Sequence, residues 1–189
     1  MFLERGFHAA SLEAVAERAG FSTGAVYSRF DSKADLFLAL LDARYPRTVD
    51  AFKKVVADAE TGEELVGSFG RWSAERLREG PAWSLVLVEF WTSAGRDPAL
   101  RERFAASHEH LIATGADVIE EAASRLDVRL AISARELVRV TAALGRGLAL
   151  ERLLNPEVVT DDLITRSFDA LTAPKTELVS SDVHFQRGR

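Results

Sequence analysis

Apolar residues recur at spacings of three and four along most of the chain, and no stretch alternates apolar and polar residues as a half-buried strand would. Helix start and stop signals divide this pattern from one end to the other. The pattern therefore predicts an all-α protein, with three short helices followed by about six longer ones.

The first start signals are serines. Ser11 can cap a helix that runs to about Arg18, and Ser22 can cap a short helix that runs to about Arg29. Ser32 then opens a long helix with an apolar stripe. Pro46 lies inside this helix, and we expect it to bend or break the helix because proline lacks the backbone donor.

The remaining start signals predict longer helices. Gly80-Pro81 ends one helix and begins the next, whose residues 83–91 (WSLVLVEFW) are apolar nearly all round, as in a helix surrounded by others. Other helices are expected to open at Thr61, at Asp97-Pro98 (to about Leu126), at the capping-box pattern Ser133 to Glu136 (to about Leu154), and at Thr160 (to about Leu171).

The helix expected at residues 133–154 carries two apolar stripes. Two such faces suggest that one packs on the core and the other on a partner. The stripes are Leu137, Thr141, Leu144 and Leu148, and Val138, Ala142, Gly145 and Ala149.

Composition fits a soluble globular protein, with 189 residues, 47% of them hydrophobic and 28% charged. No apolar run approaches the ~20 residues of a membrane span, and the N-terminal segment, with Glu4 and no apolar core, does not read as a secretory signal. The chain has no cysteine, which excludes disulfides, thiolate metal sites and a cysteine nucleophile. We therefore expect a cytoplasmic protein.

The net charge is -5 and the isoelectric point is near 5.5, which argues against a generally basic nucleic-acid coat. Residues 1–45 also carry slightly more acids than bases. Any nucleic-acid surface must therefore be local.

One local candidate is AGFSTGAVYSRFDSK at residues 19–33. Two short helices joined by a glycine turn make a helix-turn-helix unit, whose second helix enters the major groove of DNA. Gly20 can take the left-handed conformation of the turn, and we expect Phe21 to plug into the core of the small domain. Ser22 and Thr23 lie at a helix N-terminus, which favours a phosphate.

Further positions of this segment suit DNA contacts. Tyr27 and Arg29 can reach phosphates or base edges, and Lys33 begins the next helix, where a second phosphate can dock. Gly24 and Ala25 are small enough for close approach to the bases.

At these residues the sequence resembles the TetR family of transcriptional regulators. The matching positions are Gly6-Phe7, Ser11-Leu12, Val15-Ala16, Ala19-Gly20, Ser22-Thr23-Gly24, Tyr27, Phe30 and Lys33-Ala34-Asp35-Leu36. The resemblance implies a three-helix DNA-binding head, a larger helical body that binds a small effector, and a homodimer formed through the helices near 133–154 and 160–172.

Carried over position by position, the resemblance implies DNA contacts from Ser11, Ser22, Thr23, Gly24, Ala25, Tyr27, Ser28, Arg29 and Lys33. The aromatic residue that the family usually has near Ser28, and the histidine often found at Arg29, are absent, which leaves the base preference open. Taken singly, the serines could be plain helix caps, and Tyr27 and Phe30 plain core residues. Their combination favours DNA binding.

The family's first helix normally runs for several turns before the equivalent of Gly6, whereas only residues 1–5 precede it here. Either residues are missing upstream of Met1, or the head is built with a deficient core. Loss of two or three buried apolar side chains would cost on the order of several kcal/mol, so we expect poor DNA affinity of a chain that begins at Met1. The predicted domains are this head with its truncated first helix at 1–45, an effector-binding and dimerisation domain at 46–172, and a flexible tail at 173–189.

Aromatic residues concentrate on three consecutive predicted helices of the body, where a few polar residues face the same way. The predicted effector-binding residues are Phe69, Trp72, Trp83, Glu89, Phe90, Thr92, Phe104 and His108. For Glu89 a structural ion pair is an equal alternative, and for His108 a satisfied core histidine is the more frequent case.

No enzyme signature occurs. The chain has no glycine-rich phosphate loop and no nucleophile, base and acid at a recognisable spacing, and His108 and His110 do not share a helix face for a metal. We therefore predict no catalytic residues, no metal and no cofactor.

The sequence predicts a transcriptional repressor that a small-molecule effector releases from a palindromic double-stranded operator. The alternative is a dimeric helical small-molecule-binding protein whose head cannot bind DNA. An enzyme that uses Glu89 and His108 is the least favoured reading.

Overall fold

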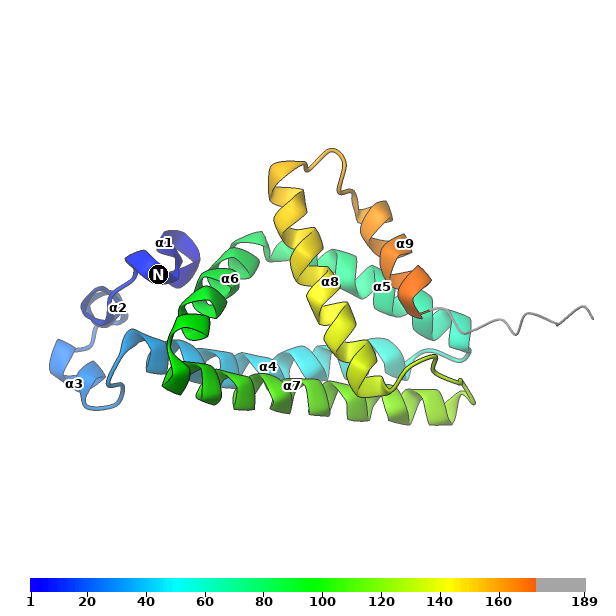
Figure 1. Ribbon diagram of the computed structural model, residues 1–189, viewed down its shortest axis with the longest axis horizontal. Helices are drawn as coiled ribbons and strands as arrows, with labels where there is room; N and C mark the ends of the chain where they lie inside the picture. Colours follow the sequence, from blue (N-terminus) through cyan, green and yellow to red (C-terminus); the bar gives the residue numbers. More distant parts are fainter. Residues whose placement is uncertain (173–189) are drawn as a thin grey trace, which may run out of the picture.

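A computed structural model of the chain describes residues 1–172, and its nine helices confirm the all-α prediction for this part, which contains no strand (Figure 1). They are α1 (Phe2–Ala9), α2 (Leu12–Ala19), α3 (Thr23–Tyr27), α4 (Lys33–Ala57), α5 (Gly62–Glu79), α6 (Pro81–Arg96), α7 (Pro98–Arg125), α8 (Ala134–Leu154) and α9 (Asp161–Thr172). The predicted tail at 173–189 lies outside the described residues. None of the described helices is both long enough and apolar enough to cross a bilayer.

Serine caps start the helices of the head as predicted. The hydroxyls of Ser11, Ser22 and Ser32 each accept a hydrogen bond of 3.2 Å from the backbone N–H three residues later. Ser133 and Glu136 form the full reciprocal capping box at α8. At α2 and α3 these caps fix the boundaries of helices too short to be stable by themselves.

The predicted break at Pro46 is absent, because α4 continues through it from Lys33 to Ala57. Buried side chains flank the proline, with Leu41 at 0% and Val49 at 6% exposure. Packing on both sides of Pro46 holds the helix together despite the lost backbone hydrogen bond.

Two glycines set the path of the head. Gly6, at φ 78°, interrupts α1, and a side chain there would collide with Glu89, whose Oε1 lies 2.7 Å from the position of a Cβ. Gly20, at φ 72°, ends α2 in the left-handed conformation expected for the turn. The positive φ angle favours glycine at both positions.

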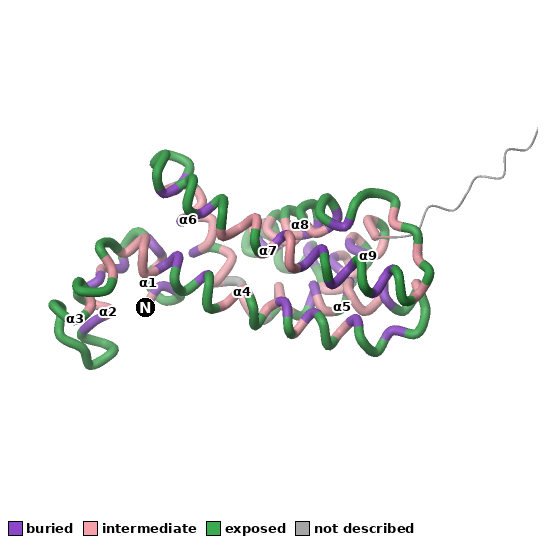
Figure 2. The backbone as a smooth tube through the Cα atoms, turned by 90° about the horizontal axis from the view of Figure 1, so that it is seen from below, coloured by how far each residue is buried: buried purple, intermediate pink, exposed green. Residues whose placement is uncertain are grey.

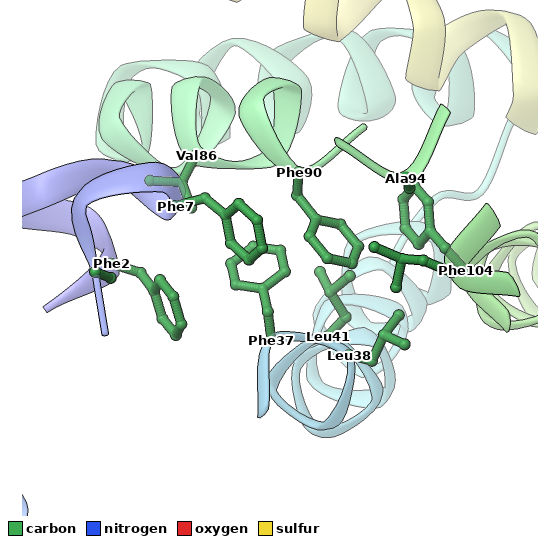
Figure 3. Packing of buried hydrophobic residues seen from close by; sticks show 11 residues of the cluster. Phe2, Phe7, Phe37, Leu38, Leu41, Val86, Phe90, Ala94 and Phe104 are labelled. Carbon is green, nitrogen blue, oxygen red and sulfur yellow. The ribbon is translucent and has the colours of Figure 1, made fainter. Parts of the chain in front are cut away.

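One aromatic cluster joins the N-terminal helices to the rest of the molecule (Figure 3). Phe7 of α1, Phe37 of α4 and Phe90 of α6 are almost fully buried, and their ring centroids lie 4.6 to 5.4 Å apart. The predicted boundary between residues 45 and 46 falls inside continuous α4, so the division into two domains stays a prediction.

The remaining helices form a body behind this cluster. α4 and α7 run side by side along its length, α8 crosses them, and α5 packs against α9 (Figure 1). Buried residues line α4 and α7, whereas α3 and its flanking turns are exposed (Figure 2). The molecule thus has α1 to α3 at one end and a packed helical body at the other.

The prediction that one apolar stripe of α8 faces a partner is wrong. Leu137 packs in the core of the body and Leu144 and Leu148 pack beside α9, while the second stripe lines a cavity or is buried, as Ala149 is. Both stripes contact the chain's own helices because α8 packs against α5, α6, α7 and α9. The apolar side chains of α8 that remain exposed are Val140, Leu153 and Leu154.

Candidate functional site

The nine residues predicted to contact DNA lie at one end of the molecule, on and around α3 (Figure 1). The short helix has no buried residue and packs on α2. Seven of the nine (Ser22, Thr23, Gly24, Ala25, Tyr27, Ser28 and Arg29) are exposed, and Ser11, Tyr27 and Lys33 line one surface hollow. The structure therefore brings the predicted set together at one end of the molecule.

Tyr27 and Arg29 present different groups on this face. The Tyr27 hydroxyl donates to Glu13 Oε1 at 2.5 Å, which fastens α3 to α2 and raises the pKa of Tyr27. Its ring stays 45% exposed. The Arg29 side chain is exposed and forms no ion pair with the described residues, so its guanidinium is available to an external anion.

Lys33 has a structural contact that the sequence did not suggest. Its Nζ donates to the backbone oxygens of His8 at 2.6 Å and Ala10 at 3.2 Å, and it lies 4.9 Å from the centroid of the Phe7 ring. Lys33 thus holds the C-terminal end of α1 on α4. An ammonium has three N–H groups, so one remains for a phosphate.

The expected role of Phe21 is wrong, because its side chain is 65% exposed. Leu12 and Ala16 are the buried residues of this helix pair instead. Phe21 closes the turn after α2 through its backbone, whose N–H donates to the Ala16 oxygen at 3.0 Å. A turn residue of this kind needs no buried side chain.

The eight predicted effector residues do not form one site. Phe90 and Phe104 are buried in the aromatic cluster, and Thr92 is exposed, with its hydroxyl donating to the backbone oxygen of Glu89. Glu89 Oε2 accepts the His8 N–H at 3.1 Å. Glu89 therefore links α6 to α1, and its carboxylate lies beside Gly6, where α1 is interrupted.

Trp83 lines a hollow between the N-terminal helices and the body, which we call the head hollow. Its volume is about 580 Å³, and Arg44 lies over the Trp83 ring, 4.4 Å from its centroid. Side chains of α1, α2, α4, α5 and α6 line it, and they leave Leu3 and Leu40 exposed.

Phe69 and Trp72 line a second cavity of about 220 Å³ inside the body, which we call the body cavity. Its lining is almost entirely apolar and comes from α4, α5, α7, α8 and α9: Thr48, Val49, Phe52, Phe69, Trp72, Ser73, Arg76, Leu77, Leu111, Ile112, Gly115, Val138, Thr141, Ala142, Gly145 and Phe168. Ligand pockets usually measure ~300–1,000 Å³, so the body cavity suits a small apolar group. Thr48 and Arg76 also line the head hollow.

His108 lies outside both cavities, in a group that we call the donor cluster: Tyr45, Trp91, His108 and Arg146. The Arg146 guanidinium lies 4.4 Å from the centroid of the Trp91 ring, and that ring is 5.2 Å from His108. Sequence reasoning selected only His108. Arg146 had a signal, since it is a charge within the largely apolar stretch 144–150.

His108 makes stability depend on pH. Burial, aided by the positive charges of Arg146 and Arg139 and opposed by Glu109, lowers the pKa of His108 to about 4 from 6.5. Between these values the unfolded chain binds more protons, so the free energy of unfolding falls as the pH drops from 6.5 towards 4.

We expect this loss to be on the order of 2 kcal/mol for the half-buried ring, and to disappear in His108→Gln. Urea unfolding at pH 7.5, 6 and 4.5 measures it. His110→Gln, an exposed position on the same helix, should keep the wild-type slope. Equal slopes in wild type and His108→Gln would contradict the neutral buried imidazole.

Comparison with known families gives matches over most of the chain. The family profile of TetR-type bacterial regulatory proteins matches residues 1–40, and the profile of the BetI-type transcriptional repressor C-terminal domain matches residues 62–173. The HTH-type transcriptional activator FasR of Mycolicibacterium smegmatis is 36% identical over 56 residues, which cover 30% of this chain and 26% of FasR. The match thus spans about a quarter of that relative.

Solved structures share the fold at low identity. The fatty acid degradation regulator FadR of Bacillus halodurans superposes with a TM-score of 0.70 at 15% identity, covering 90% of this chain and 87% of that one. FadR of Bacillus subtilis in complex with stearoyl-CoA superposes with a TM-score of 0.68 at 13% identity, covering 93% of this chain and 94% of that one. A TetR-family regulator from Rhodococcus sp. superposes with a TM-score of 0.70 at 21% identity, covering 91% of this chain and 92% of that one.

Proposed function

The chain belongs to the TetR family of bacterial regulatory proteins, and on that basis we propose that it represses transcription until a small-molecule effector releases it from its operator. The observation that carries the proposal is the exposed surface of α3 and the residues after it, which presents small residues at Gly24 and Ala25 and an Arg29 that forms no ion pair within residues 1–172. The BetI-type repressor profile matched by the body supports repression over activation.

In this proposal the head reads DNA through all nine predicted residues. The exposed side chains of α3 face the major groove, and Arg29 contacts a base edge or a phosphate. Tyr27 and Lys33 act differently, because their polar groups also fasten α3 to α2 and α1 to α4. Such contacts fix how the reading helix is presented, and the remaining Lys33 N–H reaches a phosphate.

A homodimer places two such heads about one DNA turn apart, ~34 Å, on a palindromic operator. We propose that α8 and α9 form the dimer contact. Exposed residues Val140, Gly147 and Leu154 recur every seven residues on α8, and Leu154 is 78% exposed. Binding to chromosomal DNA implies that the dimer works in the cytoplasm.

We expect Val140→Asp combined with Leu154→Asp to convert the dimer into a monomer, since an interface would bury two unpaired carboxylates. The measurement is the molar mass from size-exclusion chromatography with light scattering, which should halve. Ile132→Asp, an exposed apolar position before α8, is the matched control and should stay dimeric. A double variant with the wild-type mass would remove α8 from the interface.

The effector is proposed to enter the body cavity. Its apolar lining supports an apolar effector, and so does one structural neighbour, the fatty acid degradation regulator FadR of Bacillus halodurans. Thr48 and Arg76 line the body cavity and the head hollow, so a ligand that moves α4 or α5 also changes the surroundings of α1 and α2. In the dimer, such a movement changes the distance between the two heads, and this change lowers the affinity for the operator.

The test is selection of duplexes from a random DNA pool with the full chain, followed by a reporter assay. We expect enrichment of an inverted repeat, and lower reporter expression when that repeat lies within the promoter. Absence of any enriched sequence would overturn DNA binding, and increased expression would overturn repression.

A second function is favoured by one observation, the head hollow with its exposed Leu3 and Leu40. A head packed in this way can be too weakly ordered to bind DNA, which would leave a dimeric helical protein that only binds a small molecule. The same selection separates the two functions, because this protein would enrich no sequence and would still bind its ligand.

A further inference from the structure

The donor cluster brings together polar groups from four helices of the body: Tyr45 from α4, Trp91 from α6, His108 from α7 and Arg146 from α8. Arg146 stacks on Trp91, and Trp91 meets His108 edge to face. Tyr45 is close enough to Arg146 for the two to interact electrostatically. The cluster therefore offers a guanidinium, an indole N–H, a phenol and an imidazole.

These donors lack an anionic partner in the structure. Arg146 is largely buried but forms no ion pair with the described residues, and the Trp91 Nε1 is buried without a hydrogen-bond partner. An unpaired buried charge and an unpaired buried N–H both cost stability. A cluster of this kind is satisfied when an acceptor, preferably an anion, enters it.

The nearby carboxylates do not fill this role. Asp42, one turn before Tyr45, accepts a hydrogen bond from the Ser107 hydroxyl at 2.5 Å. Glu109, next to His108, pairs with Arg139 at 2.5 Å. The protein thus directs its own acids to other partners and leaves the cluster without one.

The cluster lies close to residues that line the body cavity. Tyr45 comes three residues before Thr48, and His108 three residues before Leu111, which both line the cavity. Arg146 directly follows Gly145, another lining residue. Because residues three or four apart share a helix face, Tyr45 and His108 lie one turn from residues that line the cavity, although none of the four cluster side chains lines it. The polar donor cluster is therefore adjacent to the apolar body cavity.

We propose that the donor cluster binds the carboxylate of an effector whose apolar part fills the body cavity. This inference rests on the proposed function and names the chemical class of its effector, an apolar carboxylic acid of modest size. Arg146 pairs with the carboxylate, and the Trp91 N–H and the Tyr45 hydroxyl donate to its oxygens. The uncharged His108 avoids adding a second buried positive charge.

The test compares two probes of equal chain length, octanoate and octan-1-ol, by isothermal titration calorimetry on the full chain. Octanoate should bind at least about tenfold more tightly than octan-1-ol, as expected for a charge-assisted hydrogen bond. Arg146→Met should remove that tenfold preference and leave the affinity for octan-1-ol within about twofold.

Three controls make the result specific. Arg135→Met, an exposed arginine on the same helix, should leave both affinities unchanged. Arg146→Lys should restore part of the preference. Trp91→Phe, which removes only the indole N–H and keeps an aromatic ring, should weaken octanoate binding alone, so the inference stays testable if Arg146→Met does not fold.

Two results would overturn the inference. Equal affinity for octanoate and octan-1-ol in the wild-type chain would leave the body cavity as an effector site, and with it the proposed function, but would exclude a carboxylate site. Failure of octanoate to bind at millimolar concentration would exclude the carboxylate as well. DNA selection decides the proposed function separately in either case.

Discussion

Replacing Phe90 with alanine should lower the free energy of unfolding by about 3–5 kcal/mol, a large part of the stability of a chain of this size. The side chain is fully buried, and its ring centroid lies 5.1 Å from that of Phe7, 4.6 Å from Phe37 and 5.0 Å from Phe104. The variant leaves a cavity where α1, α4, α6 and α7 meet. Urea unfolding followed by circular dichroism measures the change.

The same substitution should loosen the head before it affects the body, because Phe7 depends on Phe90 for packing. Hydrogen exchange should therefore rise first in α1 and α2. Leu85→Ala, on the same helix but 43% exposed, should change stability by less than about 1 kcal/mol. A similarly small loss in Phe90→Ala would mean that the aromatic cluster does not join head and body.

Ala25→Asp should reduce affinity for the selected operator by about 100-fold or more while leaving thermal stability nearly unchanged. Ala25 is an exposed residue of α3, so its substitution disturbs no packing. The new carboxylate would lie against DNA phosphates, and like charges brought together at an interface cost several kcal/mol. A gel-shift titration measures the loss.

Ala131→Asp is the matched control, since it adds the same charge at an exposed position between α7 and α8, at the far end of the body. It should bind the operator like the wild-type chain. An equal loss in both variants would point to net charge, and wild-type affinity in Ala25→Asp would move the DNA interface away from α3.

Local signals of the sequence predicted the helices well. Caps such as Ser11 and Ser133 act within three residues, and Gly20 adopts the left-handed turn conformation through its own backbone freedom. Each of these features can therefore be predicted without knowledge of the fold. The exposed face of α3 follows from the same local pattern. Features that depend on residues close together in the sequence can therefore be predicted from the sequence alone.

Contacts between distant helices explain where the predictions failed. Glu89 looked like a pocket residue because it lies in an apolar run, yet its partner is the His8 N–H, 81 residues earlier in the chain. Pro46 was expected to disrupt α4, but long-range packing maintains it. Arg146 belongs to the donor cluster because α4, α6 and α7 place Tyr45, Trp91 and His108 near it, and the sequence alone does not show this proximity.

The most direct test of the central claim is the affinity of the full chain for the selected inverted repeat and for a scrambled duplex, measured by gel shift over a range of salt concentrations. A DNA-reading dimer should prefer the repeat by at least about 1,000-fold, with the logarithm of its affinity falling linearly with the logarithm of salt concentration. Equal affinity for the two duplexes would contradict the assignment of α3 as a reading helix.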